Sequence, residues 1–277
     1  MKIDFTKMHG AGNDFIVVDA VRKPISLTAT QIQFIADRHI GVGCDQVLIV
    51  EPPKRDDADF EYKIFNGDGS SAGQCGNGAR CVGRFIHEQR LSPKQNIALQ
   101  IGDELMRLEI SENKDVRAEL GKPQFDLAQV PCTLDSSGLE HELKLGHVAV
   151  NAGILSMGNP HAVILVDDCA ATPVGKIGPM VQALEIFPDG VNVGFMELES
   201  RDEVSLRVFE RGAGETRACG SGACAAVVHG ITMGWLSPKV TVKLPGGKLE
   251  VTWRGDDHPV WLSGPALTVF GGNIDLQ

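Results

Sequence analysis

The chain has 277 residues, of which 43% are hydrophobic and 22% are charged, and its net charge is −10. This composition is typical of a soluble globular protein with one large or two modest domains, and the negative charge argues against nucleic acid as a main partner. The sequence contains no stretch of eighteen apolar residues, so no membrane span is predicted. Its N-terminus lacks the apolar run of a signal peptide, and the expected location is therefore the cytoplasm.

The first half of the chain predicts a mixture of strands and helices. In chain order it predicts a strand, a helix, two strands, a second helix and a hairpin, at residues 12–19, 29–40, 46–51, 59–65, 75–90 and 100–110. The strands are apolar runs or alternate apolar with polar residues. The first helix has Thr28 or Thr30 as its expected cap, and a Gly/Ser-rich loop leads into the second helix.

The second half of the chain repeats this order. The phrase "CGNGA" at Cys75 returns as "CGSGA" at Cys219, 144 residues later, again at the expected start of a helix. Other segments match at the same offset, while the strand at residues 12–19 needs an offset of 146. The matched positions are Gln46 with Gly190, Asp59 with Glu203, Gly102 with Gly246 and, at the longer offset, Asn13 with Asn159. Several matches in one register indicate a duplicated α+β unit.

The boundary between the two predicted halves is expected near residues 121–131, a stretch that contains two prolines and a glycine. The N-terminal half then covers residues 1–120, completed by residues 266–277 from the end of the chain, and the C-terminal half covers residues 121–265. The fold class is therefore α+β, with two pseudo-symmetric, strand-rich halves.

The odd number of cysteines, seven, favours reduced thiols over a disulfide scaffold. Small, buried structural residues are the favoured interpretation for most of them, namely Cys44, Cys81, Cys132, Cys169 and Cys224. Cys75 and Cys219 differ because each opens a helix, where unpaired backbone N–H groups and a partial positive charge favour a thiolate.

Several kinds of site are consistent with two cysteines at helix starts. Structural zinc and a thioredoxin-like redox pair are disfavoured because the sequence contains no C-x-x-C, and nucleotide binding is disfavoured because it contains no phosphate-loop motif. The duplication favours a further hypothesis. Two equivalent thiols that face one carbon acid from opposite sides would invert that carbon, one as base and the other as acid.

Six motifs between Lys7 and Ala225 resemble those of the diaminopimelate epimerase family. They are KMHGAGNDF, GVGCDQ, FNGDGSSAGQCGNGARC, MGNPHAV, GVNVGF and FERGAGETRACGSGACA. The resemblance implies two halves that each form a barrel-like sheet with a central helix, and an active site in the cleft between them. It also implies epimerisation of LL- to meso-2,6-diaminopimelate, a step in lysine and peptidoglycan precursor synthesis, without metal or cofactor, in a homodimer.

The same resemblance assigns roles to individual residues. Cys75 and Cys219 are implied as the catalytic acid–base pair, with His161 and Glu210 as helpers that tune the thiols. The implied ligands of the non-reacting end of the substrate are Asn13, Gln46, Asn66, Asn159, Asn192 and Arg211, with Glu210 also beside the substrate. Those of the reacting carboxylate are Gly76, Asn77, Gly220 and Ser221, the last a position where threonine is also familiar.

Plainer interpretations remain open for some of these residues. Asn13 and Asn66 are also typical of turns, His161 of a partly buried core histidine, and Glu210 with Arg211 of a surface ion pair. For the whole protein the alternatives are a related racemase of the proline racemase type, or a non-enzymatic amino-acid-binding or redox protein.

Overall fold

The computed structural model of the protein describes residues 1–73 and 75–276. Gln74, which precedes the first cysteine phrase, and Gln277 lie outside the described residues. The chain divides into two compact units: unit 1 is Met1–Glu119 with Ser263–Gln277, and unit 2 is Leu120–Leu262. None of the helices in the described part of the chain is long and apolar enough to cross a membrane.

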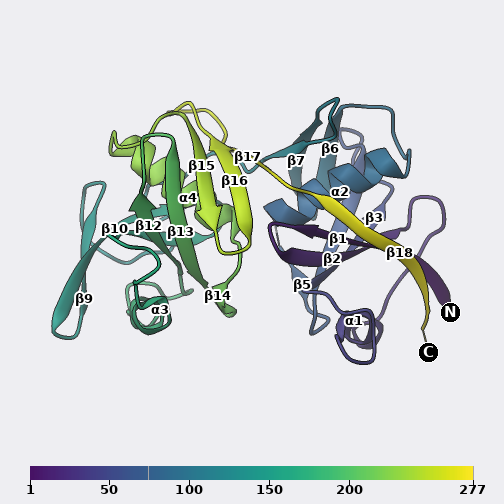
Figure 1. Ribbon diagram of the computed structural model, residues 1–277, viewed down its shortest axis with the longest axis horizontal. Helices are drawn as coiled ribbons and strands as arrows, with labels where there is room; N and C mark the ends of the chain where they lie inside the picture. The colour runs from purple at the N-terminus through teal and green to yellow at the C-terminus, as the bar shows by residue number, and fades with distance from the viewer. Residues whose placement is uncertain (74, 277) are drawn as a thin grey trace. The chain divides into compact units, whose positions relative to one another are not determined.

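Unit 1 is a strand-rich sheet with two helices (Figure 1). Its elements are β1 (Lys2–Gly10), β2 (Asn13–Asp19), α1 (Ala29–Ala36), β3 (Gln46–Glu51), β4 (Phe60–Asn66), β5 (Ser71–Ala72), α2 (Gly76–Glu88), β6 (Asn96–Ile101), β7 (Glu104–Ile110), β8 (Val116–Glu119) and β18 (Leu267–Asp275). Neighbouring strands follow the order β18-β1-β2-β3-β4-β6-β7-β8, and β5 also pairs with β4. The β2–β3 and β4–β6 pairs are parallel, and the other pairs are antiparallel.

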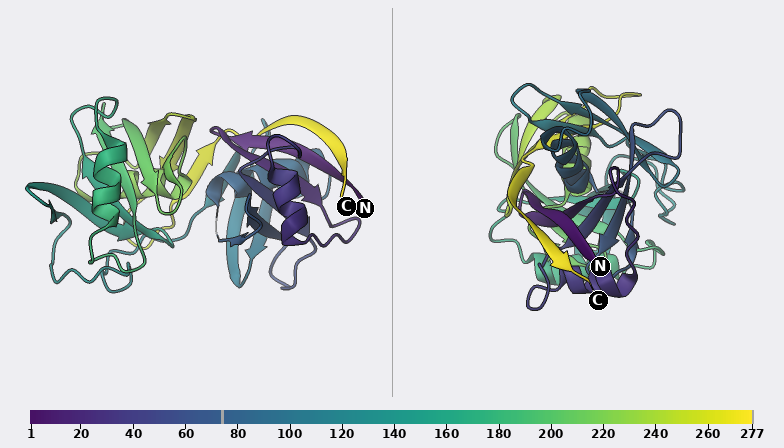
Figure 2. Two further views of the ribbon diagram at one scale, coloured as in Figure 1. Left: turned by 90° about the horizontal axis from the view of Figure 1, so that it is seen from below. Right: turned by 90° about the vertical axis from the view of Figure 1, so that its right-hand side faces the viewer.

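The end of the chain returns to its beginning. Strand β18 pairs with β1 over nearly its whole length, and the two strands lie side by side in Figure 1 and in the left view of Figure 2. The N-terminal amino group donates to the carbonyl of Leu276 at 2.5 Å, and the N–H of Leu276 donates to the carbonyl of Met1 at 2.7 Å. The last strand is thus an integral part of unit 1.

Unit 2 repeats the plan of unit 1. Its elements are β9 (His141–Leu145), β10 (Val148–Ser156), β11 (Pro160–Leu165), α3 (Val174–Gln182), β12 (Asn192–Leu198), β13 (Glu203–Glu210), β14 (Gly214–Thr216), α4 (Gly220–Thr232), β15 (Lys239–Leu244) and β16 (Gly247–Thr252). Strand β17 (Trp261–Gly264) contains the boundary with the returning segment of unit 1. Neighbouring strands follow the order β9-β10-β11-β12-β13-β15-β16, and β14 also pairs with β13. This order, and the direction of each pair, match those of β18-β1-β2-β3-β4-β6-β7 in unit 1, where β5 pairs with β4.

Residue-by-residue register confirms the duplication and corrects its offset. Phe15 pairs with Gln46 in unit 1, and His161 pairs with Asn192 in unit 2, so both strands are related by 146 residues. Gln46 therefore corresponds to Asn192, and its predicted match with Gly190 is wrong. The offset returns to 144 after the hairpin loop, because residues 52–59 form a longer connection than residues 199–202. Insertions fall in loops, since a shift within a strand would turn its buried face outward.

The predicted match between the later hairpins of the two units is also wrong by one residue. Ile101 pairs with Glu104 and Leu244 pairs with Gly247, so the two turns are related by 143 residues. Gly102 is equivalent to Pro245, and its predicted match with Gly246 is wrong by one position. The two-residue turn needs no particular pairing of glycines, because only its ends are fixed by the ladder.

Helix α1 starts as predicted and ends earlier. Thr28 caps it through a reciprocal pair of hydrogen bonds with Gln31, which is the capping box. The helix stops at Ala36, four residues before the predicted end. There the carboxylate of Asp37 accepts hydrogen bonds from the N–H groups of His39 and Ile40, at 2.7 and 2.9 Å, and this local turn competes with the helix.

Each unit surrounds one long helix with its own strands, as the fold prediction required. Residues 76–83 of α2 and 222–230 of α4 are all buried. Helix α2 contacts β1, β2, β3, β7 and β8, and α4 contacts β10, β11, β12, β13, β15 and β16. Because the two helices are buried on most sides, their first turns are fixed in place by the sheets around them.

Candidate active site

Cys75 is the N-cap residue of α2. Its sulfur accepts a hydrogen bond from the backbone N–H of Gly78 at 3.3 Å, where serine or aspartate would usually supply an oxygen. The hydroxyl of Tyr62 donates to the carbonyl of Cys75 at 3.4 Å and helps to hold this residue. The thiol is half-buried, so it lies at the helix terminus with access to a ligand.

The predicted site residues of unit 1 lie at the start of α2 and on the strands β2, β3 and β4. The Cys75 cluster consists of Asn13, Gln46, Asn66, Cys75, Gly76 and Asn77. The sulfur of Cys75 lies 4.0 Å from Oδ1 of Asn13, with the thiol as donor. Gln46 Nε2 donates to Asn66 Oδ1 at 3.0 Å across paired strands β3 and β4. Its polar side chains other than Cys75 are therefore all neutral amides.

Asn77 lies in the first turn of α2 and is held from within the helix. Its Oδ1 accepts from Arg80 Nη2 at 2.7 Å, and Arg80 Nη1 donates to the carbonyl of Gly76 at 3.2 Å. Both side chains are almost completely buried. The backbone N–H groups of Gly76 and Asn77 have no carbonyl within their own helix to pair with, so the first turn can bind an anion.

Cys219 occupies the same position at the start of α4. Its sulfur accepts from the N–H of Gly222 at 3.4 Å and lies 3.7 Å from the hydroxyl of Ser221. This thiol is only 4% exposed. Burial and the nearby carboxylate of Glu210 hold the pKa of Cys219 well above its usual range, although the hydrogen bonds from Gly222 and Ser221 act in the opposite direction. Cys219 is therefore a protonated thiol at neutral pH.

Glu210 reaches Cys219 from the end of β13. The hydroxyl of Thr216, on the adjoining strand β14, donates to Oε1 of Glu210, and β13 and β14 pair directly. Thr216 was not predicted as a site residue, although it lies inside the quoted motif FERGAGETRACGSGACA. This hydrogen bond holds the Glu210 carboxylate, which also interacts with the thiol of Cys219.

Asn159 and His161 lie next to each other at the start of β11. Asn159 Nδ2 donates to the hydroxyl of Ser221 at 3.3 Å, and His161 Nε2 lies 3.0 Å from Asn159 Oδ1. Burial, and then the positive charge of Arg211, lowers the pKa of His161 to about 3. The imidazole is therefore neutral, and its Nε2–H faces the amide oxygen because that oxygen only accepts.

Asn192 connects β12 to the loop that carries Arg211. Its Nδ2 donates to the carbonyl of Pro160 at 3.0 Å, and its Oδ1 accepts from the N–H of Arg211 at 3.1 Å. The guanidinium of Arg211 donates to the carbonyl of Asp189 at 2.7 Å, and the residue is exposed. Asn192 is 4% exposed, so one amide N–H and one lone pair remain for any further partner.

The Cys219 cluster consists of Asn159, His161, Asn192, Glu210, Arg211, Cys219, Gly220 and Ser221. It differs in charge from the Cys75 cluster. Where unit 2 has His161, Glu210 and Arg211, the equivalent positions of unit 1 hold Phe15, Asn66 and Gly67. The duplicated fold therefore carries ionisable side chains beside Cys219 at three positions whose equivalents in unit 1 are uncharged.

The other cysteines are structural in their surroundings. Cys44, Cys81, Cys132, Cys169 and Cys224 are buried and form no disulfide in the described part of the chain. Burial raises the pKa of Cys81 to about 12 and that of Cys44 and Cys169 to about 11. Among the described residues, no three histidine, cysteine, aspartate or glutamate side chains gather closely enough to hold a metal ion.

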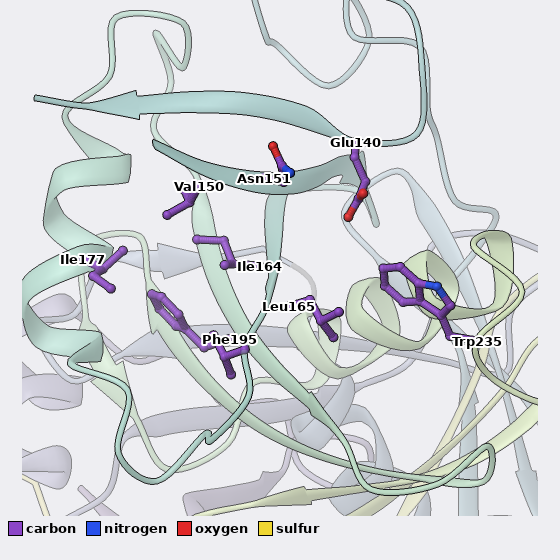
Figure 3. A pocket seen from close by; sticks show the side chains of 9 residues that line it. Glu140, Val150, Asn151, Ile164, Leu165, Ile177, Phe195 and Trp235 are labelled. Atoms are coloured by element: carbon purple, nitrogen blue, oxygen red, sulfur yellow. The ribbon is translucent and has the colours of Figure 1, made fainter. Parts of the chain in front are cut away.

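Unit 2 also has a cavity of about 430 Å³ away from the Cys219 cluster (Figure 3). Ile177 of α3 and Trp235 lie at opposite ends of its lining, with Ile164 and Phe195 between them. Its lining is mostly apolar, with Glu140 as its one charged residue. None of the predicted site residues lines it, and a substrate with two zwitterionic ends would leave most of its charges unpaired there.

Comparison with solved structures defines the fold class. A hydroxyproline epimerase from Agrobacterium vitis, crystallised with trans-4-hydroxy-L-proline, matches 99% of this chain and 92% of its own with a TM-score of 0.72 at 14% identity. A phenazine biosynthesis protein from Bacillus anthracis matches all of both chains with a TM-score of 0.68 at 15% identity. The protein therefore has the two-unit fold shared by epimerases and phenazine biosynthesis proteins of this type.

Sequence comparison defines the family within that fold. The model of the family described as diaminopimelate epimerase matches residues 5–126 and 153–269. Curated diaminopimelate epimerases from Teredinibacter turnerae and Alkalilimnicola ehrlichii are 49% and 48% identical, each over the full length of both chains. The chain belongs to the diaminopimelate epimerase family and is an enzyme of the isomerase class.

Proposed function

We propose that the protein converts LL-2,6-diaminopimelate to meso-2,6-diaminopimelate, with Cys75 and Cys219 as the pair that moves the proton. The observation that carries the proposal is the equivalence of the two thiols, each the N-cap of the central helix of its unit. Inversion of a carbon needs a base on one face and an acid on the other, and a duplicated thiol supplies both. The scheme requires both sulfurs to reach one α-carbon, and it needs no metal or cofactor.

The two thiols have different roles at the start of the reaction. Cys219 retains its proton because burial and Glu210 raise its pKa, so it is the acid that delivers a proton to the substrate. Cys75 lies among amides and is the base that removes the α-proton as a thiolate. After the turnover Cys75 holds the proton and Cys219 is the thiolate. A proton from solvent then returns to Cys219 by way of the Glu210 carboxylate, and Cys75 releases its proton to solvent. The neutral imidazole of His161 holds the amide of Asn159, which donates to the hydroxyl of Ser221 beside Cys219.

The first turns of α2 and α4 bind the reacting carboxylate in this proposal. The backbone N–H groups of Gly76, Asn77, Gly220 and Ser221 are unpaired within their helices and lie next to the thiols. As the α-proton leaves, negative charge spreads onto the carboxylate, where these donors stabilise it. One such donor contributes about 3–4 kcal/mol to transition-state stabilisation in other enzymes.

The distal end of the substrate binds to the remaining polar groups. Arg211 offers a planar guanidinium for the distal carboxylate. The amides of Gln46 and Asn66 in unit 1, and of Asn159 and Asn192 in unit 2, supply donors and acceptors for the zwitterion. Asn192 also fixes the loop of Arg211 by accepting from the N–H of that residue, and it keeps one amide N–H and one lone pair for the substrate.

The proposal also covers assembly and location. Strand β18 exposes three large apolar side chains, those of Leu267, Val269 and Phe270, which suit the contact surface of a homodimer. Diaminopimelate is the one small-molecule partner in this proposal. The cysteines of the described residues form no disulfide, which suits the reducing cytoplasm. Sedimentation of the purified protein, with a Phe270→Lys variant for comparison, tests the dimer. A monomeric wild-type protein would remove this part of the proposal.

The function is tested by incubating the protein with LL-diaminopimelate in deuterium oxide. We expect meso-diaminopimelate to form with deuterium at the inverted α-carbon, as seen by NMR and mass spectrometry. Deuterium uptake with L-proline and not with diaminopimelate would indicate a racemase of the proline type. No exchange with either substrate would indicate a binding or redox protein.

A further inference from the structure

A network of charged side chains joins two of the sequence motifs in unit 1. Lys7 and Asp14 belong to the motif KMHGAGNDF, and Asp45 belongs to GVGCDQ. Lys7 Nζ lies 2.5 Å from Asp14 Oδ2, and Arg38 bonds to Asp14 at 2.8 and 3.0 Å and to Asp45 at 2.8 Å. None of these four residues has a role in the proposed reaction.

The backbone strengthens the connection between Asp14 and Asp45. The N–H of Asp14 donates to Asp45 Oδ2 at 3.0 Å, and the N–H of Asp45 donates to Asp14 Oδ1 at 2.9 Å. Burial would raise the pKa of Asp14, but the hydrogen bonds from Arg38 and Lys7 outweigh it and hold the pKa well below its usual range. The carboxylate is therefore charged at neutral pH and keeps Asp45 in a fixed position.

Asp45 determines which way the side chain of Asn13 faces. Asn13 Nδ2 donates to Asp45 Oδ2 at 2.9 Å, while Asn13 Oδ1 lies 4.0 Å from the sulfur of Cys75. An ionised carboxylate only accepts hydrogen bonds, so the amide must turn its NH₂ group toward Asp45. The amide oxygen is then directed at Cys75.

Unit 2 forms the same fold without this network. The positions 146 residues after Lys7, Asp14, Arg38 and Asp45 are occupied by uncharged residues, namely Gly153, Pro160, Leu184 and Val191. Asn159, the equivalent of Asn13, is held instead by Ser221 and His161. Because unit 2 forms the same fold without these charges, we infer that the charged residues of unit 1 have a role near Cys75 and not in the fold.

We propose that Asp45 is a positioning residue, which holds the carboxamide oxygen of Asn13 toward Cys75, and that Lys7, Asp14 and Arg38 hold Asp45. This inference rests on the proposed function in assuming that Cys75 transfers the proton. The oriented oxygen accepts from the thiol or from a substrate ammonium beside it. If the amide were free to rotate, its NH₂ group would donate to the sulfur part of the time. It would then stabilise the thiolate and make Cys75 a weaker base for the α-proton.

The test is a double-mutant cycle with Asp45→Ala and Asn13→Ala. If Asp45 acts through Asn13, Asp45→Ala lowers kcat/KM about 3- to 10-fold in the wild-type background, the effect of one lost hydrogen bond. It lowers kcat/KM less than about 2-fold in the Asn13→Ala background, since the amide to be oriented is gone. Equal losses in both backgrounds, or no loss in either, overturn the inference. Asp45→Ser replaces the alanine variant if that variant does not fold.

A second readout does not depend on epimerisation. The pH dependence of Cys75 alkylation by iodoacetamide, followed by mass spectrometry, should move to lower pH in Asp45→Ala and not move further in the double variant. Asp59→Ala is the matched control, because Asp59 also bonds a lysine and a backbone N–H in unit 1 but has no contact with Asn13. An unchanged alkylation profile in Asp45→Ala overturns the inference. A wild-type protein that fails to epimerise, with the alkylation shift present, overturns only the proposed function.

Discussion

Asn66 and Glu210 occupy equivalent positions, 144 residues apart, at the ends of β4 and β13. The amide of Asn66 bonds to Gln46 and Ser70, while the carboxylate of Glu210 bonds to Thr216 and interacts with Cys219. This substitution between the duplicated units, together with the deeper burial of Cys219, makes the two thiols chemically different.

Replacing Glu210 with glutamine should lower the pKa of Cys219. The carboxylate raises that pKa by its charge and by accepting from the thiol, and glutamine has no charge. The pKa should remain above the ordinary range, since the burial of Cys219 is unchanged. Alkylation of Cys219 measured against pH by mass spectrometry checks this. Glu215→Gln serves as the control, because Glu215 pairs with Arg207; an equal shift in both variants would contradict the assignment.

Removing either N-cap thiol should abolish epimerisation. Cys75→Ala and Cys219→Ala each leave one face of the substrate without its acid or base, a loss of about 100- to 10,000-fold in kcat. Cys81→Ala and Cys224→Ala, further along the same helices, should retain most of the activity, because these thiols are buried among packed side chains. Full turnover by the Cys219→Ala variant would exclude the two-thiol scheme.

The sequence predicted the features that follow from local pattern. The duplicated phrase located both central helices and their first residues, since glycines after a cysteine mark a helix start that a side chain can cap. The sequence left Thr28 and Thr30 as possible caps of α1, and the structure selects Thr28, which forms a capping box with Gln31. The end of α1 was not predicted correctly, since the turn at Asp37 competes with a helix on nearly equal terms.

Partners that are distant in sequence could not be predicted from the sequence. Nothing in the chain indicates that Asp45 would bond to Asn13, or that Thr216 would bond to Glu210, because these contacts depend on which strands pair. The offset of 146 at Gln46 was also hidden, since apolar strand sequences match one another in several registers. Only the ladder of paired residues fixes it.

Acid should destabilise the protein through His161. The pKa of this buried imidazole is about 3, against 6.5 in its ordinary state, so between these values the unfolded chain binds a proton and the folded chain does not. The free energy of unfolding should therefore fall by about 1.4 kcal/mol for each pH unit below 6.5, down to about pH 3. Denaturant unfolding at pH 4 to 7 measures it.

A matched pair of variants isolates the contribution of His161. His161→Phe introduces the residue found at the equivalent position of unit 1, Phe15, which is fully buried there. Its unfolding free energy should depend less on pH than that of the wild type, whereas His147→Gln, at an exposed position, should leave the slope unchanged. Burial also lowers the pKa of His141 and His229, so some acid sensitivity should remain. An unaltered slope in His161→Phe would show that the imidazole is protonated in the folded protein.

The glycines that donate to the two sulfurs should differ in their tolerance of alanine. A Cβ at Gly222 would lie 3.0 Å from Val208 and 3.2 Å from the sulfur of Cys219, closer than side chains normally pack, whereas a Cβ at Gly78 would lie 3.4 Å from the sulfur of Cys75. Gly78→Ala should keep its activity and gain up to about 1 kcal/mol of stability from helix propensity. Gly222→Ala should displace Cys219 and lose about 10-fold or more in kcat. Similar kinetics for both variants would contradict this packing.

The last prediction concerns how the enzyme distinguishes the two ends of its substrate. Each end of diaminopimelate carries an amine and a carboxylate, and we assign the distal carboxylate to Arg211. Arg211→Lys keeps the charge but loses the planar fork, at a cost of about 1–3 kcal/mol, so KM should rise about 10- to 100-fold.

The two thiols should not respond to this change, because Arg211 is exposed and bonds to the carbonyl of Asp189. The alkylation profiles of Cys75 and Cys219 in Arg211→Lys should therefore match those of the wild type. A substrate analogue without the distal amine should likewise react with a much lower kcat/KM than diaminopimelate, since the amides that face that amine would be left without their partner. Equal rates with the analogue would mean that the enzyme does not recognise the distal end of the substrate. Arg211 and the amides would then have a structural role within their own units.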